Sequence, residues 1–546
     1  PIIRGNTFES NQNVNAVSFK FQINTNVNSV VFENNTFNNQ KSSLGGFGGE
    51  IDTDLGSYDL IFLNCKFINN EQTMLGGGFQ SNNNLNKAKI TFTDCIFNNN
   101  IAVGKGGALT INTNQDVMIN GCTFTGNKVN DGISEGGAIY IYENTEQNER
   151  KISIQNCQYE NNKAKEGCSI ISYSKKTLIV DSFSFINTEQ PLTANLYDIV
   201  TYSSAILFGN NTIDFSAIED QMGSIKILNI GNIKIYDSKF SQVKENGVVY
   251  YDSDVTGTIS NSFTVENCTF NQCKGVCCYL NILSGSFEKV VIDSNVFDKC
   301  IKNNLNAISI YLGQVSNSIS LEIQNNTFSN CPTSSSSVYC LTLTFNRAPD
   351  NLGPILFTDN TINYDDAYKA NQGIYAEQEN REIVFRNCSF RHCFKGGGPY
   401  WASTIIVDRF SNVIIEECKF DDCGINDGGN IICIYTSVIK STVENCVFDH
   451  TSGENDKCGS AISTYTDNMI IIGNKFTKCA QNSVRIECKG KGDQFQLIDN
   501  YFTGCNLGYI IIVFNHFSNT PIIRGNTFEN NQNSGEVSFK FQINTI

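Results

Sequence analysis

Residues 1–25 read PIIRGNTFESNQNVNAVSFKFQINT, and residues 521–545 read PIIRGNTFENNQNSGEVSFKFQINT. The two segments differ at only four positions and lie 520 residues apart. A repeat this close is considered before local structure, because periodic sequences fold as stacked units. We therefore expect one continuous repeat unit over residues 1–520, with residues 521–546 beginning the next near-identical unit of a tandem array. On this interpretation the chain is a segment of a longer protein.

A shorter motif recurs between the two copies. It consists of Asn, Asp or Gly, then Cys or Asn, then any residue, then Phe, as in Asn64-Cys65-Lys66-Phe67 and Asp94-Cys95-Ile96-Phe97. From Phe8 to Phe528 the motif marks eighteen intervals, which gives a period of about 29 residues. The long repeat therefore contains a short one.

The segments between the motifs indicate strands. Helical repeats would need apolar residues at i, i+3, i+4 and i+7, and this spacing does not occur. Short runs rich in Val, Ile, Phe, Tyr and Thr, such as residues 431–435, alternate with clusters of Asn, Gly, Asp and Ser. The sequence therefore predicts an all-β parallel β-helix solenoid of about 18 coils of roughly 29 residues.

The motif defines columns of like residues. With its Phe as position 0, position −2 is Cys or Asn in seventeen of nineteen copies. Positions −2 and 0 face the same side of a strand, and stacked coils lie about 4.8 Å apart, so like side chains should lie above one another. We expect stacked rings at position 0 and hydrogen-bonded amides at position −2. The predicted core ladder comprises Phe67, Phe97, Phe124, Phe270, Phe390, Phe420 and Phe448.

Position +3 is a third column, occupied by Asn in some coils and by Cys in others. The step from position 0 to position +3 changes the strand parity, so we expect a bend between them. Asn suits a bend because it tolerates left-handed backbone.

The 22 cysteines favour an oxidising, extracellular compartment. Because columns bring Cys residues of adjacent coils within reach, we favour disulfides in some columns. Buried free thiols, acting as small apolar residues, are the alternative. Zinc needs four convergent ligands, so no metal or other cofactor is predicted. The disulfide candidates are Cys65, Cys95, Cys122, Cys157, Cys273, Cys300, Cys393, Cys423, Cys479 and Cys505.

Five Asn-x-Ser/Thr sequons fall at position −3. The alternation of side chains places this position outward, which makes N-glycosylation feasible. The candidate sites are Asn34, Asn210, Asn267, Asn325 and Asn387.

The sequence resembles a known family in its first 170 residues or so. Residues 97–100 (FNNN) followed by 106–109 (GGAL), and residues 124–127 (FTGN) followed by 136–139 (GGAI), are similar to the repeat of polymorphic outer membrane proteins and of large protist surface proteins. The resemblance implies a right-handed parallel β-helix at a cell surface, used in adhesion or as a coat, and not an enzyme. It weakens further along, where Cys replaces Asn at position +3.

Composition excludes several classes of protein. The net charge is −15 without a basic stripe, so nucleic acid is not an expected partner. No apolar run approaches the roughly 18 residues of a membrane helix. We interpret the paired aspartates and the histidines as turn or surface residues. We expect the adjacent Tyr and Trp of one loop to be packed rather than to bind sugar. A single imperfect glycine motif is not sufficient evidence for calcium binding. These residues are Asp365, Asp366, Asp421, Asp422, His392, His450, His516, Tyr400, Trp401 and residues 45–50.

These observations predict a structural protein of an extracellular filament, surface appendage or coat, and not an enzyme. Its partners would be further copies of itself along the fibre axis and N-glycans, and its location extracellular or at the cell surface. Eighteen coils at about 4.8 Å give a unit of roughly 86 Å. The alternatives are a cell-surface adhesin or carbohydrate-binding stalk, and a polysaccharide lyase or hydrolase, whose carboxylates could come from different coils.

Overall fold

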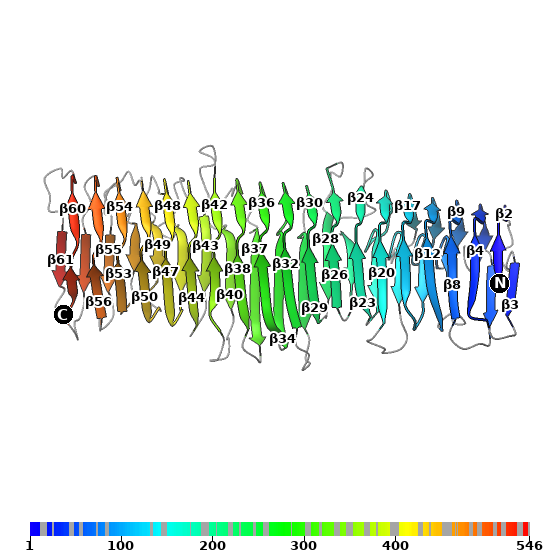
Figure 1. The fold of residues 1–546 in the computed structure, drawn as a ribbon, viewed down its shortest axis with the longest axis horizontal. Helices are drawn as coiled ribbons and strands as arrows, with labels where there is room; N and C mark the ends of the chain where they lie inside the picture. The colour runs from blue at the N-terminus through cyan, green and yellow to red at the C-terminus, as the bar shows by residue number, and fades with distance from the viewer. Residues whose placement is uncertain are drawn as a thin grey trace. The chain divides into compact units, whose positions relative to one another are not determined.

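The chain folds into two compact units, Pro1–Ser253 and Asp254–Ile546. Figure 1 shows their strands as arrows, coloured by residue number. The structure is a computed structural model, and all regular structure that it describes is β-strand. A search of the described residues for membrane-spanning helices finds none. The description covers all residues except 11–18, 24–26, 43–48, 54–57, 73–74, 82–86, 131–134, 143–149, 175, 187–195, 204, 217–221, 229–230, 244–246, 255–260, 286, 301–306, 316–318, 332–338, 346–352, 365–371, 378–380, 394–402, 424–429, 436–437, 450–460, 465, 467, 480–483, 489–493, 506–509, 515–519, 532–538 and 544–546.

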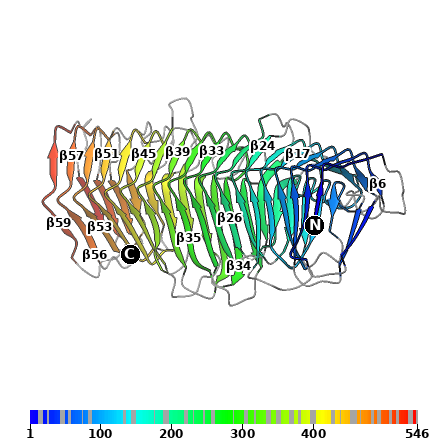
Figure 2. The same cartoon turned by 45° about the vertical axis from the view of Figure 1, so that its right-hand side comes forward.

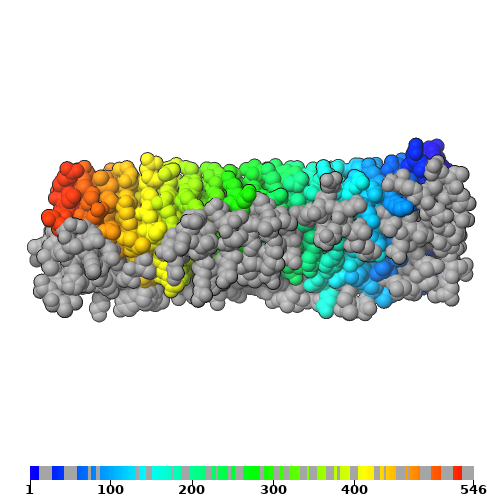
Figure 3. All heavy atoms as spheres, turned by 90° about the horizontal axis from the view of Figure 1, so that it is seen from below, coloured from blue at the N-terminus to red at the C-terminus, as the bar shows by residue number. Residues whose placement is uncertain are grey.

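Each unit is a stack of coils with three walls. Within a coil, a strand of wall A is followed by a short strand of wall B and then by a strand of wall C (Figure 2). Each strand pairs in parallel with its equivalent in the next coil, as β8 does with β12. Neighbouring coils of a unit therefore form parallel bands of colour in Figure 3.

The strands of unit 1 follow this order. Wall A holds β1 (Ile2–Arg4), β4 (Ser29–Glu33), β8 (Tyr58–Leu63), β12 (Ala88–Thr93), β16 (Val117–Asn120), β20 (Lys151–Gln155), β23 (Thr177–Asp181), β26 (Ala205–Gly209) and β29 (Asn232–Tyr236). Wall B holds β2 (Thr7–Glu9), β5 (Thr36–Asn38), β9 (Lys66–Ile68), β13 (Ile96–Asn98), β17 (Thr123–Thr125), β21 (Gln158–Glu160), β24 (Ser184–Ile186), β27 (Thr212–Asp214) and β30 (Lys239–Ser241). Wall C holds β11 (Phe79–Gln80), β15 (Leu109–Asn112), β19 (Ile139–Tyr142), β22 (Ile170–Tyr173), β25 (Leu196–Thr201), β28 (Met222–Leu228) and β31 (Val249–Asp254).

Two small sheets complete unit 1. The first has four short parallel strands between walls B and C, namely β6 (Lys41–Ser42), β10 (Glu71–Gln72), β14 (Ile101–Ala102) and β18 (Lys128–Val129). The second pairs β3 (Phe19–Ile23) with β7 (Gly49–Thr53) in parallel.

Unit 2 repeats the three walls. Wall A holds β32 (Asn261–Glu266), β35 (Phe287–Asp293), β38 (Ser320–Gln324), β41 (Ile355–Thr358), β44 (Glu382–Arg386), β47 (Asn412–Glu416), β50 (Lys440–Glu444), β53 (Asn468–Ile472), β56 (Gln494–Ile498) and β59 (Ile522–Arg524). Wall B holds β33 (Thr269–Asn271), β36 (Val296–Asp298), β39 (Thr327–Ser329), β42 (Thr361–Asn363), β45 (Ser389–Arg391), β48 (Lys419–Asp421), β51 (Val447–Asp449), β54 (Lys475–Thr477), β57 (Tyr501–Thr503) and β60 (Thr527–Glu529). Wall C holds β34 (Cys278–Gly285), β37 (Ile308–Val315), β40 (Tyr339–Phe345), β43 (Gln372–Glu377), β46 (Ser403–Asp408), β49 (Asn430–Ile434), β52 (Ile462–Thr464), β55 (Val484–Cys488), β58 (Ile510–Phe514) and β61 (Phe539–Ile543).

The predicted fold class is confirmed: the described chain is an all-β parallel β-helix solenoid. Wall A has nine strands in unit 1 and ten in unit 2, one more in total than the eighteen coils predicted. The additional coil is the second copy of the repeated segment, which contributes β59 and β60. No observation tests whether residues 1–520 form the unit of a tandem array, so this stays a prediction.

Phenylalanines of successive coils lie in files, by which we mean lines of like side chains along the stack. In unit 1, Phe67 lies opposite Phe97, and Phe97 opposite Phe124. Their ring centroids are 4.7 and 4.9 Å apart, and the rings are within 4° of parallel. All three rings are fully buried. The equivalent stacked pairs of unit 2 include Phe270–Phe297, Phe390–Phe420 and Phe420–Phe448.

A file of buried asparagines runs beside the rings at position +3. The backbone N–H and the Nδ2 of Asn70 both donate to Oδ1 of Asn100, at 3.1 and 2.9 Å. Asn100 donates in the same way to Asn127, at 3.0 and 2.9 Å, and its Nδ2 also donates to the carbonyl of Phe67 at 2.8 Å. Buried polar groups are stable when hydrogen-bonded. The file therefore supplies hydrogen-bond partners for its own buried amides.

The bend predicted between positions 0 and +3 is confirmed, and its left-handed residue lies at position +2 rather than in the column at position +3. Asn69 and Asn99, at position +2, have positive φ angles of 54° each, and Asn64, at position −3, has 51°. Asn70 and Asn100 instead point into the core. Each corner spans two residues, of which the first takes the left-handed conformation that Asn tolerates and the second turns inward.

Candidate functional site

The repeated segment forms the pairing edge of a coil in both units. In unit 1, β1 and β2 pair with β4 and β5, which places Phe8 opposite Phe37. In unit 2, β59 and β60 pair with β56 and β57, which places Phe528 opposite Phe502. The first copy therefore contacts the coil that follows it in the sequence, whereas the second copy contacts the coil that precedes it. One short sequence is compatible with a neighbour on either side.

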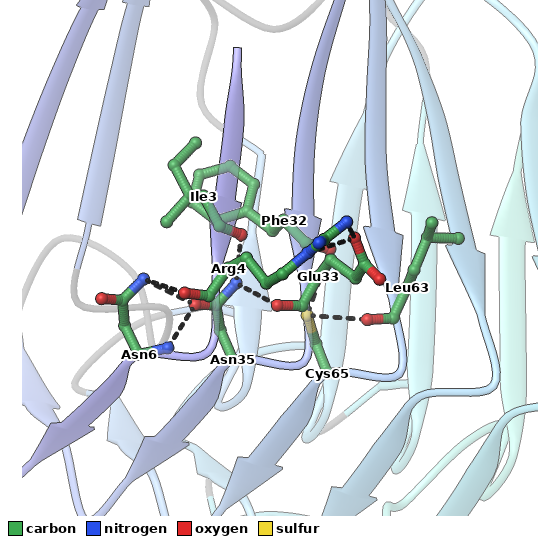
Figure 4. A network of polar contacts seen from close by, with 8 residues as sticks. All are labelled: Ile3, Arg4, Asn6, Phe32, Glu33, Asn35, Leu63 and Cys65. Carbon is green, nitrogen blue, oxygen red and sulfur yellow. Dashed lines mark hydrogen bonds and ion pairs between the residues drawn. The ribbon is translucent and has the colours of Figure 1, made fainter.

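Asparagine gives the first copy a donor role (Figure 4). The backbone N–H and the Nδ2 of Asn6 both donate to Oδ1 of Asn35, at 2.9 and 3.0 Å. Asn35 returns a bond from Nδ2 to the carbonyl of Ile3, at 2.7 Å. These bonds hold one coil on the next, because every donor in them has an acceptor across the coil boundary.

The second copy has the complementary acceptor role. Both the N–H and the Nδ2 of Asn500 donate to Oδ1 of Asn526 at 3.0 Å. Asn526 returns a bond from Nδ2 to the carbonyl of Leu497 at 2.8 Å. Asn6 and Asn526 occupy the same place in the repeated segment. Taken together they make every contact that Asn326, an internal asparagine at position −2, makes with the coils on either side.

Aromatic stacking follows the same rule. The Phe8 ring lies 5.0 Å from Phe37, and the Phe528 ring lies 4.9 Å from Phe502, with both pairs within 4° of parallel. Phe502 is 2% exposed, whereas Phe528 is 45% exposed. Ile522 and Ile523 beside it are also exposed. A further coil stacked on β60 would remove this apolar surface from water, which stabilises association.

An ion pair crosses the same coil boundary in unit 1. Arg4 Nε donates to Glu33 Oε2 at 2.8 Å (Figure 4). The Arg4 side chain is 62% exposed, and an exposed pair contributes only about 0–1 kcal/mol. The pair therefore favours the register of the two coils more than it stabilises them.

The ten cysteines proposed as disulfide partners are all buried. Cys65 takes the place that Asn35 has one coil earlier, and its thiol donates to the carbonyls of Phe32 and Leu63 at 3.4 Å each (Figure 4). Cysteine and asparagine are therefore interchangeable at position −2, because each can donate to the equivalent pair of backbone carbonyl groups. Disulfide formation in the columns stays a prediction.

Burial disfavours the thiolate form of three buried cysteines. It raises the pKa of Cys122 and Cys388 well above the usual value, and that of Cys168 to about 12. Only thiolates attack disulfide reagents. We therefore expect these three cysteines to react with an aromatic disulfide reagent at pH 8 no faster than the chain unfolds, as followed by mass spectrometry of the labelled peptides. Labelling of native protein within the first minutes would contradict this prediction.

The five candidate glycosylation sites are exposed. Each takes the left-handed conformation, with φ between 51° and 55°. Some side chains have neighbours: Nδ2 of Asn210 donates to Asp181, at 2.8 Å, and Nδ2 of Asn387 donates to Asp359, at 2.6 Å. Glycosylation itself stays a prediction. The full set is Asn34, Asn210, Asn267, Asn325 and Asn387.

The other polar candidates lie partly within the described chain. His392 Nε2 lies 3.4 Å from Asp422, at the corners that follow β45 and β48, and Arg391 lies 3.7 Å from Asp421. These are contacts between neighbouring coils at the surface. Outside the described residues lie Asp365, Asp366, His450, His516, Tyr400, Trp401 and most of residues 45–50.

A tyrosine file on wall C of unit 1 was not predicted. The ring of Tyr173 lies 5.7 Å from Tyr140 and 4.6 Å from Tyr202. Lys105 Nζ donates to the Tyr140 hydroxyl at 2.8 Å and lies 4.5 Å from the centre of its ring. The signal was the alternation of Ile and Tyr along β19, which turns the tyrosines away from the core.

Fold and repeated coil together define a parallel β-solenoid protein. No family model matches the chain, and no curated protein matches it. Among solved structures, the chain is similar to the PL6 family alginate lyase AlyGC, with 10% identity and a TM-score of 0.24 over 99% of this chain and 97% of that chain. A point mutant of AlyGC matches with 10% identity and a TM-score of 0.18 over 97% of each chain.

These comparisons correct one prediction. Both solved structures are of an alginate lyase, and the statement that the chain is not an enzyme is withdrawn. The match assigns no catalytic residue in this chain. Of the resemblance to polymorphic outer membrane proteins, only the parallel β-solenoid is supported, because no family model matches.

Proposed function

We propose that this chain is a structural protein of an extracellular filament, surface appendage or coat. In it, 520-residue repeats, each as long as residues 1–520, continue one another through the repeated coil. One observation carries the proposal. Residues 522–529 pair with the coil that precedes them, and the identical residues 2–9 pair with the coil that follows them. A single coil of this sequence therefore fits between the last coil of one 520-residue repeat and the second coil of the next repeat.

The backbone bonds of the two copies agree with such a shared coil. The N–H of Thr36 donates to the carbonyl of Asn6 at 2.8 Å, and the N–H of Thr527 donates to the carbonyl of Asn500 at 2.8 Å. In a shared coil, Asn526 would accept from Asn500 and donate to the Asn35 of the next unit. The partner is thus a further copy of the chain along the stacking axis.

Composition and surface support an extracellular or cell-surface location. Cysteine-rich chains are typical of oxidising compartments, and the five exposed sequons leave room for N-glycans. The net charge of −15 keeps stacked chains apart laterally while the apolar coil faces join them end to end.

The proposal is tested with a two-unit chain, made of residues 1–546 followed directly by residues 27–546. We expect limited proteolysis to leave its junction uncut, because the shared coil is buried between two neighbours. Phe528→Asp should open the junction and raise the cleavage rate there at least about tenfold, since it places a charge in the phenylalanine file.

The one-unit chain of residues 1–546 provides the control. There Phe528→Asp should change stability little, because the ring is already 45% exposed. Lys475→Asp, at an exposed position of β54, should leave both chains unchanged. Rapid cutting of the unsubstituted junction, at the rate seen with Phe528→Asp, would refute the shared coil.

A further inference from the structure

Three cysteine thiols meet in the core of unit 2. The sulfurs of Cys273, Cys277 and Cys300 all lie within 4.8 Å of one another. Each residue is fully buried. No metal site was predicted from the sequence, because the columns do not bring four ligands together. Cys277 belongs to neither the −2 nor the +3 column, so the spacing does not place it beside Cys273 and Cys300.

Two coils and two walls supply the cluster. Cys273 and Cys300 follow β33 and β36 at position +3, and the register that sets Phe270 opposite Phe297 sets them side by side. Cys277 arrives from the return of the chain to wall C, where its N–H donates to the carbonyl of Ala307 at 2.9 Å. The backbone therefore fixes the third sulfur beside the other two.

Two of the sulfurs lie close to backbone carbonyl groups. Cys300 Sγ lies 3.1 Å from the carbonyl of Phe270, and Cys273 Sγ lies 3.6 Å from that of Asn271. An S–H group is a weak donor, so exchanging such a contact for a metal–sulfur bond loses little. A file such as Cys479 and Cys505 lines up two thiols, whereas this place adds a third from another wall.

We propose that Cys273, Cys277 and Cys300 bind one thiophilic d¹⁰ cation, Zn²⁺ or Cu(I). Sulfur-only ligand sets select these ions over the harder Mg²⁺ and Ca²⁺. Three sulfurs suit Cu(I), whereas the double charge of Zn²⁺ better compensates buried thiolates. Each thiol that becomes a ligand releases its proton to solvent, and neither ion changes its oxidation state. Because the sulfurs are fully buried, the ion enters while the chain folds.

The test uses the full chain, refolded from denaturant under reducing conditions with Zn²⁺ in one series and Cu(I) in another. We expect one tightly held ion per chain by elemental analysis, with one of the two ions preferred. X-ray absorption should show three sulfurs and no other ligand if the ion is Cu(I), or three sulfurs at about 2.3 Å and a fourth, lighter ligand such as water if the ion is Zn²⁺.

Cys277→Ser and Cys277→Ala test the assignment, with Cys479→Ser as the matched buried control. The Cys277 variants should lose the ion while keeping the β circular dichroism of the parent, and Cys479→Ser should retain it. If the Cys277 variants misfold, the sulfur count in the X-ray absorption of the parent decides. Three results would overturn the proposal. They are the absence of both ions from the refolded chain, retention of the ion in folded Cys277→Ala, and a disulfide between any two of the three cysteines in the protein as isolated.

Discussion

Replacing Asn100 by leucine is expected to lower the free energy of unfolding by about 2–6 kcal/mol. The substitution removes the Oδ1 that accepts both the N–H and the Nδ2 of Asn70, at 3.1 and 2.9 Å. Both donors are buried, and an orphaned buried donor costs about 1–3 kcal/mol. Leucine is of similar size, so lost hydrogen bonds and not a cavity account for the loss.

Urea unfolding measures this change, and hydrogen exchange localises it. We expect faster amide exchange in β9, β13 and β17, which are the wall B strands of the coils that the asparagine file connects. Asn130→Leu is the matched control, because Asn130 is exposed and surface changes stay within about 0.5 kcal/mol. Equal effects of the two substitutions would show that the file does not stabilise the stack.

Gly107→Ala is the second change with a large expected effect, about 3 kcal/mol or more. A Cβ at Gly107 would lie 2.1 Å from the carbonyl oxygen of Gly137 and 2.7 Å from the backbone N of Lys128. Both are backbone atoms of the next coil, which cannot rotate away as a side chain would. The substitution therefore pushes neighbouring coils apart and weakens the parallel pairing of β15 with β19.

Thermal unfolding of the whole chain measures the effect of this substitution. Gly353→Ala is the control, because a Cβ there meets only the carbonyl oxygen of Ile319, at 3.7 Å, an ordinary contact. We expect Gly107→Ala to lower the unfolding midpoint by several degrees more than Gly353→Ala does. A Gly107 variant as stable as the control would mean that the coils do not approach as closely as the structure has them.

The sequence predicts the fold through its columns. Identical spacing of Phe67, Phe97 and Phe124 is enough to predict stacked rings, because strand parity and coil spacing leave no other place for them. Which residue of a corner turns outward is harder to predict. Asn69 and Asn70 are adjacent asparagines. Asparagine is suited both to a left-handed backbone position and to a buried, hydrogen-bonded one, so the sequence does not show which of the two residues takes which position.

The repeated coil can be predicted largely from the sequence, whereas the thiol cluster cannot. Identity of residues 2–9 with 522–529 is visible in the sequence, and it predicts that units continue one another. The direction of the bonds, with Asn6 donating and Asn526 accepting, needs the structure. Cys277 was missed because its neighbours depend on where the chain returns to wall C, which no spacing rule in the sequence gives.

Electron imaging of one-, two- and three-unit chains tests the central claim most directly. If coils continue through the repeated segment, each added 520 residues should lengthen the particle by about 86 Å at constant width, and native filaments should have the same axial repeat. Particles that gain separate lobes, or that lengthen by much less than this increment, would contradict the account.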